Sequence, residues 1–209
     1  MAKGQITIYI ILGLVVLIFG GALIYKLMSP DLIVERTDTS SPCLKKLAID
    51  GLTKLSMQGS LDPEAYIASK SLKIAYFYYK DRSLIPSIDI IEQEVSFYIT
   101  DHLDECNIQG DAHLVFEKEH ANIILRMPDS RNQTAKVNVD FLSVFTVVQN
   151  IVSQVEKTPE WVDFETVHGT PFDVMILKVD KTTMIYEITD AELGLEGRPF
   201  KYRFAVKLI

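Results

Sequence analysis

The sequence predicts an α+β fold: one N-terminal transmembrane helix precedes a mixed domain with about three helices and a largely antiparallel sheet. Segments with apolar residues at helical spacing are interspersed with segments in which apolar and polar residues alternate, which indicates helices and strands in one domain. Several strand-like segments follow one another after short turns, as strands of antiparallel hairpins do. The transmembrane helix is predicted from an uncharged run of 21 residues, Gln5–Tyr25.

This uncharged run has the length of a membrane span. It is dominated by Ile, Leu, Val and Gly, and a helix that rises about 1.5 Å per residue needs about 20 such residues to cross the hydrocarbon core. It has no polar face at helical spacing, which argues against a helix in a soluble core. We therefore expect residues 5–28 to lie in lipid, within an anchor of residues 1–30. A cleaved secretory signal is the alternative, although the apolar core of such signals is shorter, about 7–15 residues.

Charges around the run predict its orientation. Lys3 and the free amine precede the run, whereas charges of both signs follow it, so we expect a cytoplasmic N-terminus and an exterior domain. We expect residues 31–41 to form a polar stalk and residues 42–209 to form the extracytoplasmic domain. Residues 31–209 hold 19 of the 21 Lys and Arg residues and all 28 Asp and Glu residues, so their formal charge is 19 minus 28, or −9. This acidic balance excludes the electrostatic footprint of nucleic-acid binding.

Three segments of the domain carry helix signals. Ser41–Pro42 begins the first, because serine is a preferred N-cap and proline a preferred first helical residue, and Gly59 is placed to end it. Pro86–Ser87 begins the second, whose acidic residues in the first two turns complement the helix dipole, and we expect that helix to end at Cys106. Valine and isoleucine recur at helical spacing in residues 144–155, which predicts the third helix.

Alternating residues predict the strands. The expected strands are residues 72–79, 112–118, 122–127, 136–142, 172–179, 183–189 and 200–208. A polar loop, Pro128–Thr134, separates the third of these from the fourth, and Asp180–Thr182 turns a hairpin. The aromatic run Tyr76–Tyr79 has two interpretations: a platform for a ligand, or a central strand buried on both faces.

The two cysteines are placed to form a disulfide. Cys43 lies at the start of the first predicted helix and Cys106 at the end of the second, so the two meet if these helices pack antiparallel. A disulfide persists outside the cytoplasm and would close a loop of roughly 60 residues. The alternative is two unpaired cysteines that behave as small buried apolar residues.

One further pattern relates to location. Asn132, in the sequence Asn-Gln-Thr, fits the acceptor pattern for N-glycosylation and lies in the predicted polar loop. In an exterior loop this asparagine is a candidate glycosylation site. A chance occurrence of so short a pattern is the alternative.

No motif in the sequence identifies a reaction. The sequence lacks the nucleophile elbow GxSxG, the zinc motif HExxH, a P-loop and the dinucleotide fingerprint GxGxxG. His113, Glu117 and His120 resemble a metal set, but on a strand His120 points to the face opposite the other two. We therefore expect no catalytic, cofactor-binding or metal-ligating residue and no cofactor.

The N-terminus resembles a processed signal. Lys3-Gly4-Gln5-Ile6-Thr7-Ile8 and the apolar run that follows are similar to the class III signal of archaeal type IV pilin-like subunits, which a prepilin peptidase cuts between Gly and Gln. The resemblance implies processing between Gly4 and Gln5, with residues 5–28 packed in a filament core. Tyr9 stands where pilins usually carry glutamate, and Ser29–Pro30 interrupts the helix that commonly continues into the pilin head.

Most of the chain resembles a broad group of archaeal single-pass surface proteins that have no established activity. The likeness rests on the Lys-Gly-Gln start, the helix that carries Cys43, and the Pro-Ser-led helix that ends at Cys106. It extends to Ile185–Asp190 and Phe200–Ala205 near the C-terminus. The resemblance implies an archaeal cell-surface protein.

These observations lead to three hypotheses of function. The first is a non-enzymatic, membrane-anchored surface protein whose exterior domain serves in interaction or envelope structure. The second is a pilin-like filament subunit, and the third is an anchored enzyme whose site assembles from residues far apart in the sequence. The expected partners are the lipid bilayer, through residues 5–28, and other proteins or further copies of the chain.

Overall fold

The computed structural model describes residues 39–69, 72–128, 131–158 and 169–208. Within these ranges no helix is both long enough and apolar enough to span a bilayer. The run predicted to cross the membrane, and with it Gly4 and Gln5, lies outside the described residues. Residues 39–209 form one compact unit.

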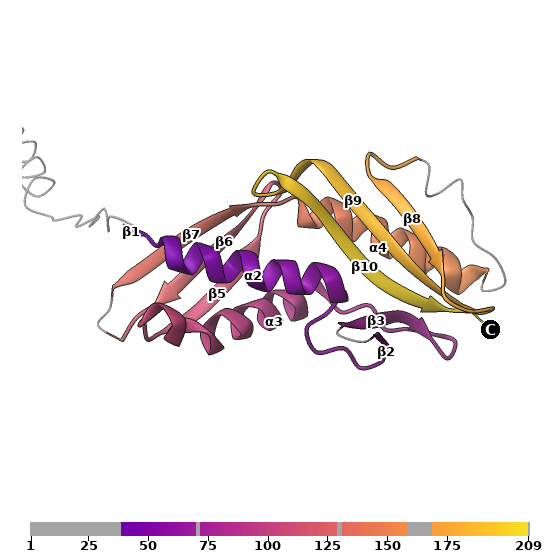
Figure 1. Cartoon of the computed structure of the whole chain (residues 1–209), viewed down its shortest axis with the longest axis horizontal. Helices are drawn as coiled ribbons and strands as arrows, with labels where there is room; N and C mark the ends of the chain where they lie inside the picture. Colours follow the sequence, from indigo (N-terminus) through magenta and orange to yellow (C-terminus); the bar gives the residue numbers. More distant parts are fainter. Residues whose placement is uncertain (1–38, 70–71, 129–130, 159–168, 209) are drawn as a thin grey trace, which may run out of the picture. The chain divides into compact units, whose positions relative to one another are not determined.

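The described residues form two sheets (Figure 1). The first has the order β1 (Thr39–Ser40), β7 (Asn132–Asn138), β6 (His120–Arg126) and β5 (Asp111–Phe116). The second has the order β2 (Tyr66–Ser69), β3 (Leu72–Tyr79), β10 (Arg198–Lys207), β9 (Thr183–Leu195) and β8 (Asp173–Lys178), and β4 (Arg82–Ser83) pairs with β3. Neighbouring strands are antiparallel except in the pairs β1–β7 and β10–β3.

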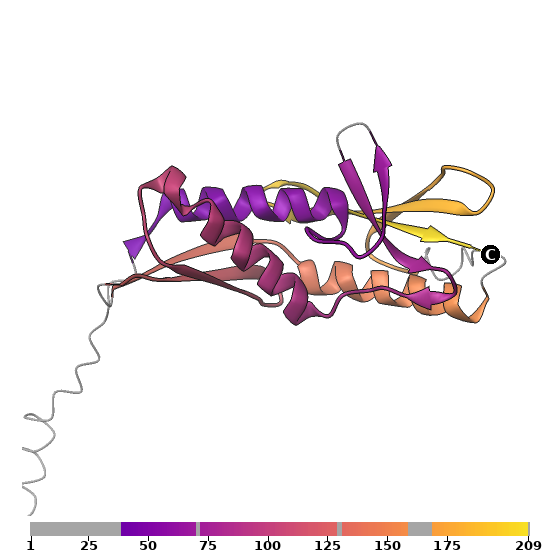
Figure 2. The same cartoon turned by 90° about the horizontal axis from the view of Figure 1, so that it is seen from below.

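Three α-helices pack on these sheets: α2 (Pro42–Gln58), α3 (Ile88–Asp101) and α4 (Phe141–Lys157), with the short 3₁₀ helix η1 (Leu103–Cys106) after α3. Helix α2 contacts β7 and β6 of the first sheet, β10 and β3 of the second, and α3. Helix α3 packs on β5, and α4 packs against β3 and β4 (Figure 2). The predicted α+β class, with three helices and largely antiparallel strands, is therefore confirmed, although the strands divide into two sheets rather than one.

Each helix begins at a capping side chain. The side chains of Ser41, Ser87 and Asp140 accept hydrogen bonds from the backbone N–H groups of Leu44, Ile90 and Ser143, as N-caps do. The predicted starts of the first two helices are confirmed, because these short-range bonds need no tertiary contact. The third helix begins at Phe141, earlier than its valine pattern indicated, because Asp140 caps it.

Gly59 ends α2, and both its backbone conformation and the close approach of a neighbouring strand require glycine there. Its φ is +81°, a conformation that favours glycine, and its N–H donates to the carbonyl of Leu55. A Cβ at this position would lie 2.6 Å from the carbonyl oxygen of Arg203. The hydroxyl of Tyr202 donates to the Gly59 carbonyl. The end of α2 is thereby held against β10.

Several predicted boundaries are wrong. Strand β7 begins at Asn132, so residues 132–134 are strand rather than loop; the polar segment forms a strand because it lies between β6 and β1. Helix α3 ends at Asp101, and Cys106 lies in η1. Strand β9 extends to Leu195, beyond the predicted end at residue 189, because it pairs with β10 along most of its length.

The aromatic residues of β3 belong to the core. Phe77 and Tyr78 are adjacent in the strand, so their side chains point to opposite faces of the sheet. Both are buried, so this part of the strand is buried on both faces, as the second interpretation expected. Phe77 stacks on Phe204 of β10 with 5.2 Å between the ring centroids. Tyr76 and Tyr79 remain half-buried.

Candidate functional site: a groove between α2 and the β9–β10 hairpin

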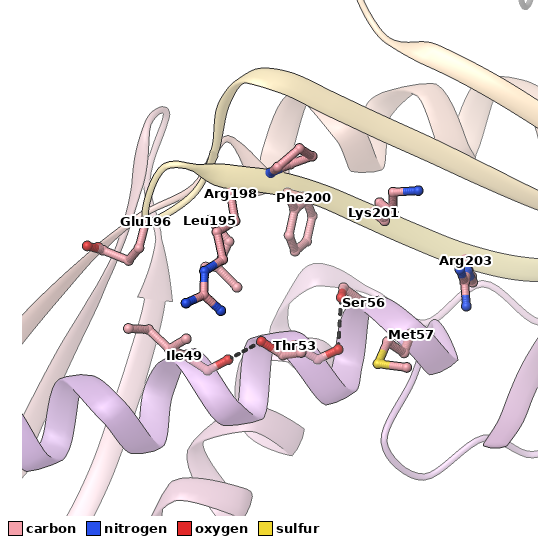
Figure 3. A pocket seen from close by; sticks show the side chains of 11 residues that line it. Ile49, Thr53, Ser56, Met57, Leu195, Glu196, Arg198, Phe200, Lys201 and Arg203 are labelled. Carbon is pink, nitrogen blue, oxygen red and sulfur yellow. Dashed lines mark hydrogen bonds between the residues drawn. The ribbon is translucent and has the colours of Figure 1, made fainter. Parts of the chain in front are cut away.

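A groove of about 450 Å³ lies between α2 and the hairpin formed by β9 and β10. Figure 3 shows side chains from α2 on one side and from the hairpin on the other. It is lined by Ile49, Thr53, Ser56, Met57, Leu195, Glu196, Arg198, Pro199, Phe200, Lys201 and Arg203. Its volume falls within the range of about 300–1,000 Å³ typical of small-ligand pockets.

The side of the groove formed by α2 offers mainly apolar groups, because the hydroxyls of its Thr53 and Ser56 donate to carbonyls of the helix itself. The hydroxyl of Thr53 donates to the Ile49 carbonyl at 2.7 Å, and the hydroxyl of Ser56 donates to the Thr53 carbonyl at 2.8 Å (Figure 3). Both hydrogens are therefore used within the helix. Met57 is 36% exposed, so its flexible thioether side chain is available to an apolar ligand group.

The hairpin that forms the other wall is fixed at its tip by Glu196. Glu196 and Gly197 both have positive φ, 51° and 77°, as in the two-residue turns that suit hairpins. The Glu196 carboxylate lies 2.9 Å from Nζ of Lys45 on α2 and accepts a bond from the backbone N–H of Asn138 at the end of β7. Burial raises the pKa of this carboxyl, but the bonds from Lys45 and Asn138 outweigh burial and hold the pKa below its ordinary value.

Three cations of β10 line the groove, and two of them share one buried carboxylate. Glu187 of β9, 2% exposed, lies 2.9 Å from Nζ of Lys201 and 2.5 Å from Nε of Arg203. Burial raises the pKa of Glu187, but the hydrogen bonds and charges of these two partners lower it below the ordinary value. Arg198 is exposed, and the structure records no ion pair for its guanidinium among the described residues.

Replacing Glu187 with glutamine should lower the free energy of unfolding at neutral pH by about 2 kcal/mol, because Lys201 and Arg203 lose their shared anion while solvent still reaches both. The folded-state pKa is depressed, so the stabilisation is complete above the unfolded-state pKa and is lost as the pH falls through the folded-state value. Urea unfolding at several pH values should show the variant and the wild type converging below about pH 4.5, the ordinary glutamate pKa. Glu192→Gln, an exposed change on the same strand, is the control and should match the wild type throughout. A difference that persists unchanged in acid would contradict the ionic role.

The first half of β10 has an open edge toward the groove. Arg198 and residues 200–204 pair with β9 on one side, whereas β3 pairs with β10 only at Ala205 and Val206. The Arg203 carbonyl points toward Gly59 at the end of α2. Because alternate residues of an antiparallel strand direct their N–H and C=O groups to the same side, the backbone of Lys201 also faces the groove. Pro199, which has no N–H, limits pairing along this edge.

The groove lining offers groups for noncovalent binding. Among the described residues, the lining holds no His, Cys or Asp, and its single carboxylate there, Glu196, is engaged by Lys45 and Asn138. The hydroxyl of Ser56 lies beside no base among the lining residues and donates to a helix carbonyl. What the groove offers is an apolar surface beside cationic groups and one strand edge.

The structure joins Cys43 and Cys106, so the predicted disulfide is confirmed. The bond connects the first turn of α2 to η1, with 5.9 Å between the Cα atoms and 63 residues of sequence separation. It lies outside the groove lining. Asn132 is the first residue of β7 and is partly exposed, at the end of a strand rather than within a loop.

The histidine set does not assemble. His120 Nε2 lies 2.8 Å from a carboxylate oxygen of Glu117, but His113 is exposed on β5, opposite Ile124 of β6. Among the described residues no group of three or more His, Cys, Asp or Glu side chains is placed to hold a metal ion. His102 stacks on Tyr98 with 4.2 Å between the ring centroids.

The charged residues of the groove were not predicted as a site. In the sequence, Lys201 and Arg203 are simply the polar face of the last strand. The dipeptide Glu196–Gly197 was a signal that could have located part of this site, because it marks a hairpin turn in which Leu195 pairs with Arg198. The pairing of Glu187 with Arg203 depends in addition on the register shift between Arg198 and Phe200, which no local sequence pattern indicates.

No protein-family model, curated protein or solved structure matches this chain.

Proposed function

We propose that the chain is a single-pass membrane protein that presents a non-enzymatic α+β domain outside the cytoplasm, where the domain binds other components of the cell envelope. The N-terminus lies in the cytoplasm and residues 5–28 cross the bilayer. The groove beside α2 is the binding site that supports a role in interaction.

The observation that carries this proposal is the disulfide between Cys43 and Cys106. Disulfides persist in oxidising compartments and are rare where thiol reductants are abundant. Both cysteines of the chain are used in this one bond, so no free thiol remains. A disulfide in the domain and an uncharged 21-residue run before it are together typical of a protein anchored with its domain outside.

Topology can be tested on the full chain in its native membrane. We expect protease added to intact cells to remove a C-terminal tag and to leave an N-terminal tag protected. Membranes should be extracted with a thiol-blocking reagent present and the chain run on a denaturing gel. The unreduced chain should migrate faster than the reduced chain, because the disulfide keeps the denatured chain more compact. A protected C-terminal tag, or full-length chain that purifies without detergent, would contradict the anchored topology.

The filament subunit is a second candidate, supported by the sequence Lys3-Gly4-Gln5 before the apolar run. In that case a prepilin peptidase releases the first four residues, and the mature chain begins at Gln5. N-terminal sequencing of protein from native membranes distinguishes the two candidates. A chain that begins at Met1 or Ala2 supports the anchor, and one that begins at Gln5 supports the filament.

A further inference from the structure

We propose that the groove between α2 and β10 binds an extended acidic segment of a partner protein, with a carboxylate of that segment on Arg198 and an apolar side chain against Met57. This inference rests on the proposed role of the domain in interaction and adds the chemistry of the partner. The occupant is a peptide segment with alternating acidic and apolar side chains.

Charge is the first argument for an acidic occupant. Residues 31–209 carry a net charge of −9, yet the groove gathers Arg198, Lys201 and Arg203. Glu187 neutralises one of these three positive charges, and Lys45 and Glu196 neutralise each other, so an excess of two positive charges remains. Figure 3 shows the Arg198 side chain extending from the hairpin toward α2 beside Ile49. An arginine fork so placed can bind a carboxylate through two parallel hydrogen bonds.

The apolar part of the lining excludes a simple anion as the best ligand. Ile49 and Met57 face the groove from α2, and Leu195 and Phe200 close it from the hairpin. Phe200 is almost fully buried, whereas Met57 is partly exposed and has room for a contact. A ligand that places an apolar side chain here removes apolar surface from water, which contributes roughly 25 cal/mol per Å² to binding. A free phosphate has no apolar group that could contribute this free energy, and acetate has only one methyl group.

The strand edge favours a peptide over a small amphiphile. Lys201 directs its backbone N–H and C=O toward the groove, because Arg203, two residues on, directs its carbonyl to the same side. A peptide in extended conformation can pair with these two groups, as in strand addition to a sheet edge. Pro199 on one side and Gly59 against Arg203 on the other limit the pairing to a short segment.

The inference can be tested with a fluorescein-labelled, end-capped peptide of sequence Glu-Leu-Glu-Leu-Glu and the full chain in neutral-detergent micelles. Fluorescence anisotropy should show saturable binding that weakens as salt is added, because exposed charge pairs are screened. Arg198→Glu should weaken binding at least about tenfold, since a charged hydrogen bond is replaced by repulsion. Lys136→Glu, with the same change of charge on an exposed residue of β7, should bind as the wild type does.

Two altered peptides separate the contributions of the ligand. Replacing both leucines with serine should weaken binding, and replacing the glutamates with lysine should abolish it. The inference is overturned if the glutamate peptide does not bind, if Arg198→Glu binds as well as the wild type, or if the serine peptide binds as tightly as the leucine peptide. The topology experiment does not depend on peptide binding. Failure of the groove proposal therefore appears only in the binding measurements, and failure of the anchor proposal appears only in the protease and extraction measurements.

Discussion

Removing the disulfide between Cys43 and Cys106 should lower the free energy of unfolding of the domain by about 4 kcal/mol. The bond closes a loop with a sequence separation of 63 residues. In the chain-entropy account, such a cross-link restricts the unfolded chain far more than the folded one. The folded domain already holds the two segments together, because α2 packs against α3 and contacts η1. The loss should therefore appear in stability while the fold is retained.

The measurement is urea unfolding of the full chain in detergent, comparing the wild type with the Cys43→Ser/Cys106→Ser double variant. The wild type under strong reductant should unfold at the midpoint of the double variant, and the double variant should not respond to reductant. A loss below about 1 kcal/mol would contradict the prediction, because it would mean that the unfolded chain keeps these segments together without the bond.

Replacing Phe141 with alanine should lower the free energy of unfolding by about 3–5 kcal/mol, the usual cost of removing a buried phenylalanine. Phe141 is fully buried at the start of α4. It stacks on Phe116 of the first sheet with 4.1 Å between ring centroids and meets Phe200 and Tyr202 of the second edge-on at 6.4 and 5.5 Å. The cavity left by the substitution would therefore lie where the cores of the two sheets meet.

Phe97→Ala is the matched control for this substitution. Phe97 lies on α3 and is 72% exposed, so removing its ring should change the free energy of unfolding by no more than about 0.5 kcal/mol. Urea unfolding of both variants in the same detergent gives the comparison. Equal losses for Phe141→Ala and Phe97→Ala would contradict the assignment of Phe141 as the residue that joins the two sheets. If Phe141→Ala does not fold, Phe141→Leu supplies the measurement with a smaller expected loss.

Signals confined to a few neighbouring residues predicted much of the fold. Ser41 and Ser87 start helices because their side chains bond to backbone groups three residues ahead, and Gly59 ends a helix because it adopts positive φ. The alternation in residues 72–79 predicted β3 with its observed bounds, and the turn after residue 179 predicted the β8–β9 hairpin. The pairing of Cys43 with Cys106 followed from the placement of both at helix ends.

Signals of this kind failed where a partner strand decided the outcome. Asn132 begins a strand because β6 and β1 pair with the polar segment that follows it. Strand β9 continues to Leu195 because β10 turns back beside it. A strand at such a place gains its stability from pairing and cross-strand contacts rather than from its own residues. Its bounds therefore depend on residues far away in the sequence.

The sequence by itself determined where the first two helices of the domain begin, which residues alternate, and which two cysteines can pair. It also showed that an uncharged run of 21 residues precedes an acidic segment. Only the tertiary structure decided that the strands form two sheets, that α2 lies along the open edge of β10, and that Glu187 is buried between Lys201 and Arg203. The physical reason is the sequence separation over which each kind of interaction acts. Caps, turns and periodicity act between residues a few positions apart, whereas the groove depends on contacts between α2 and a hairpin more than 100 residues later in the chain.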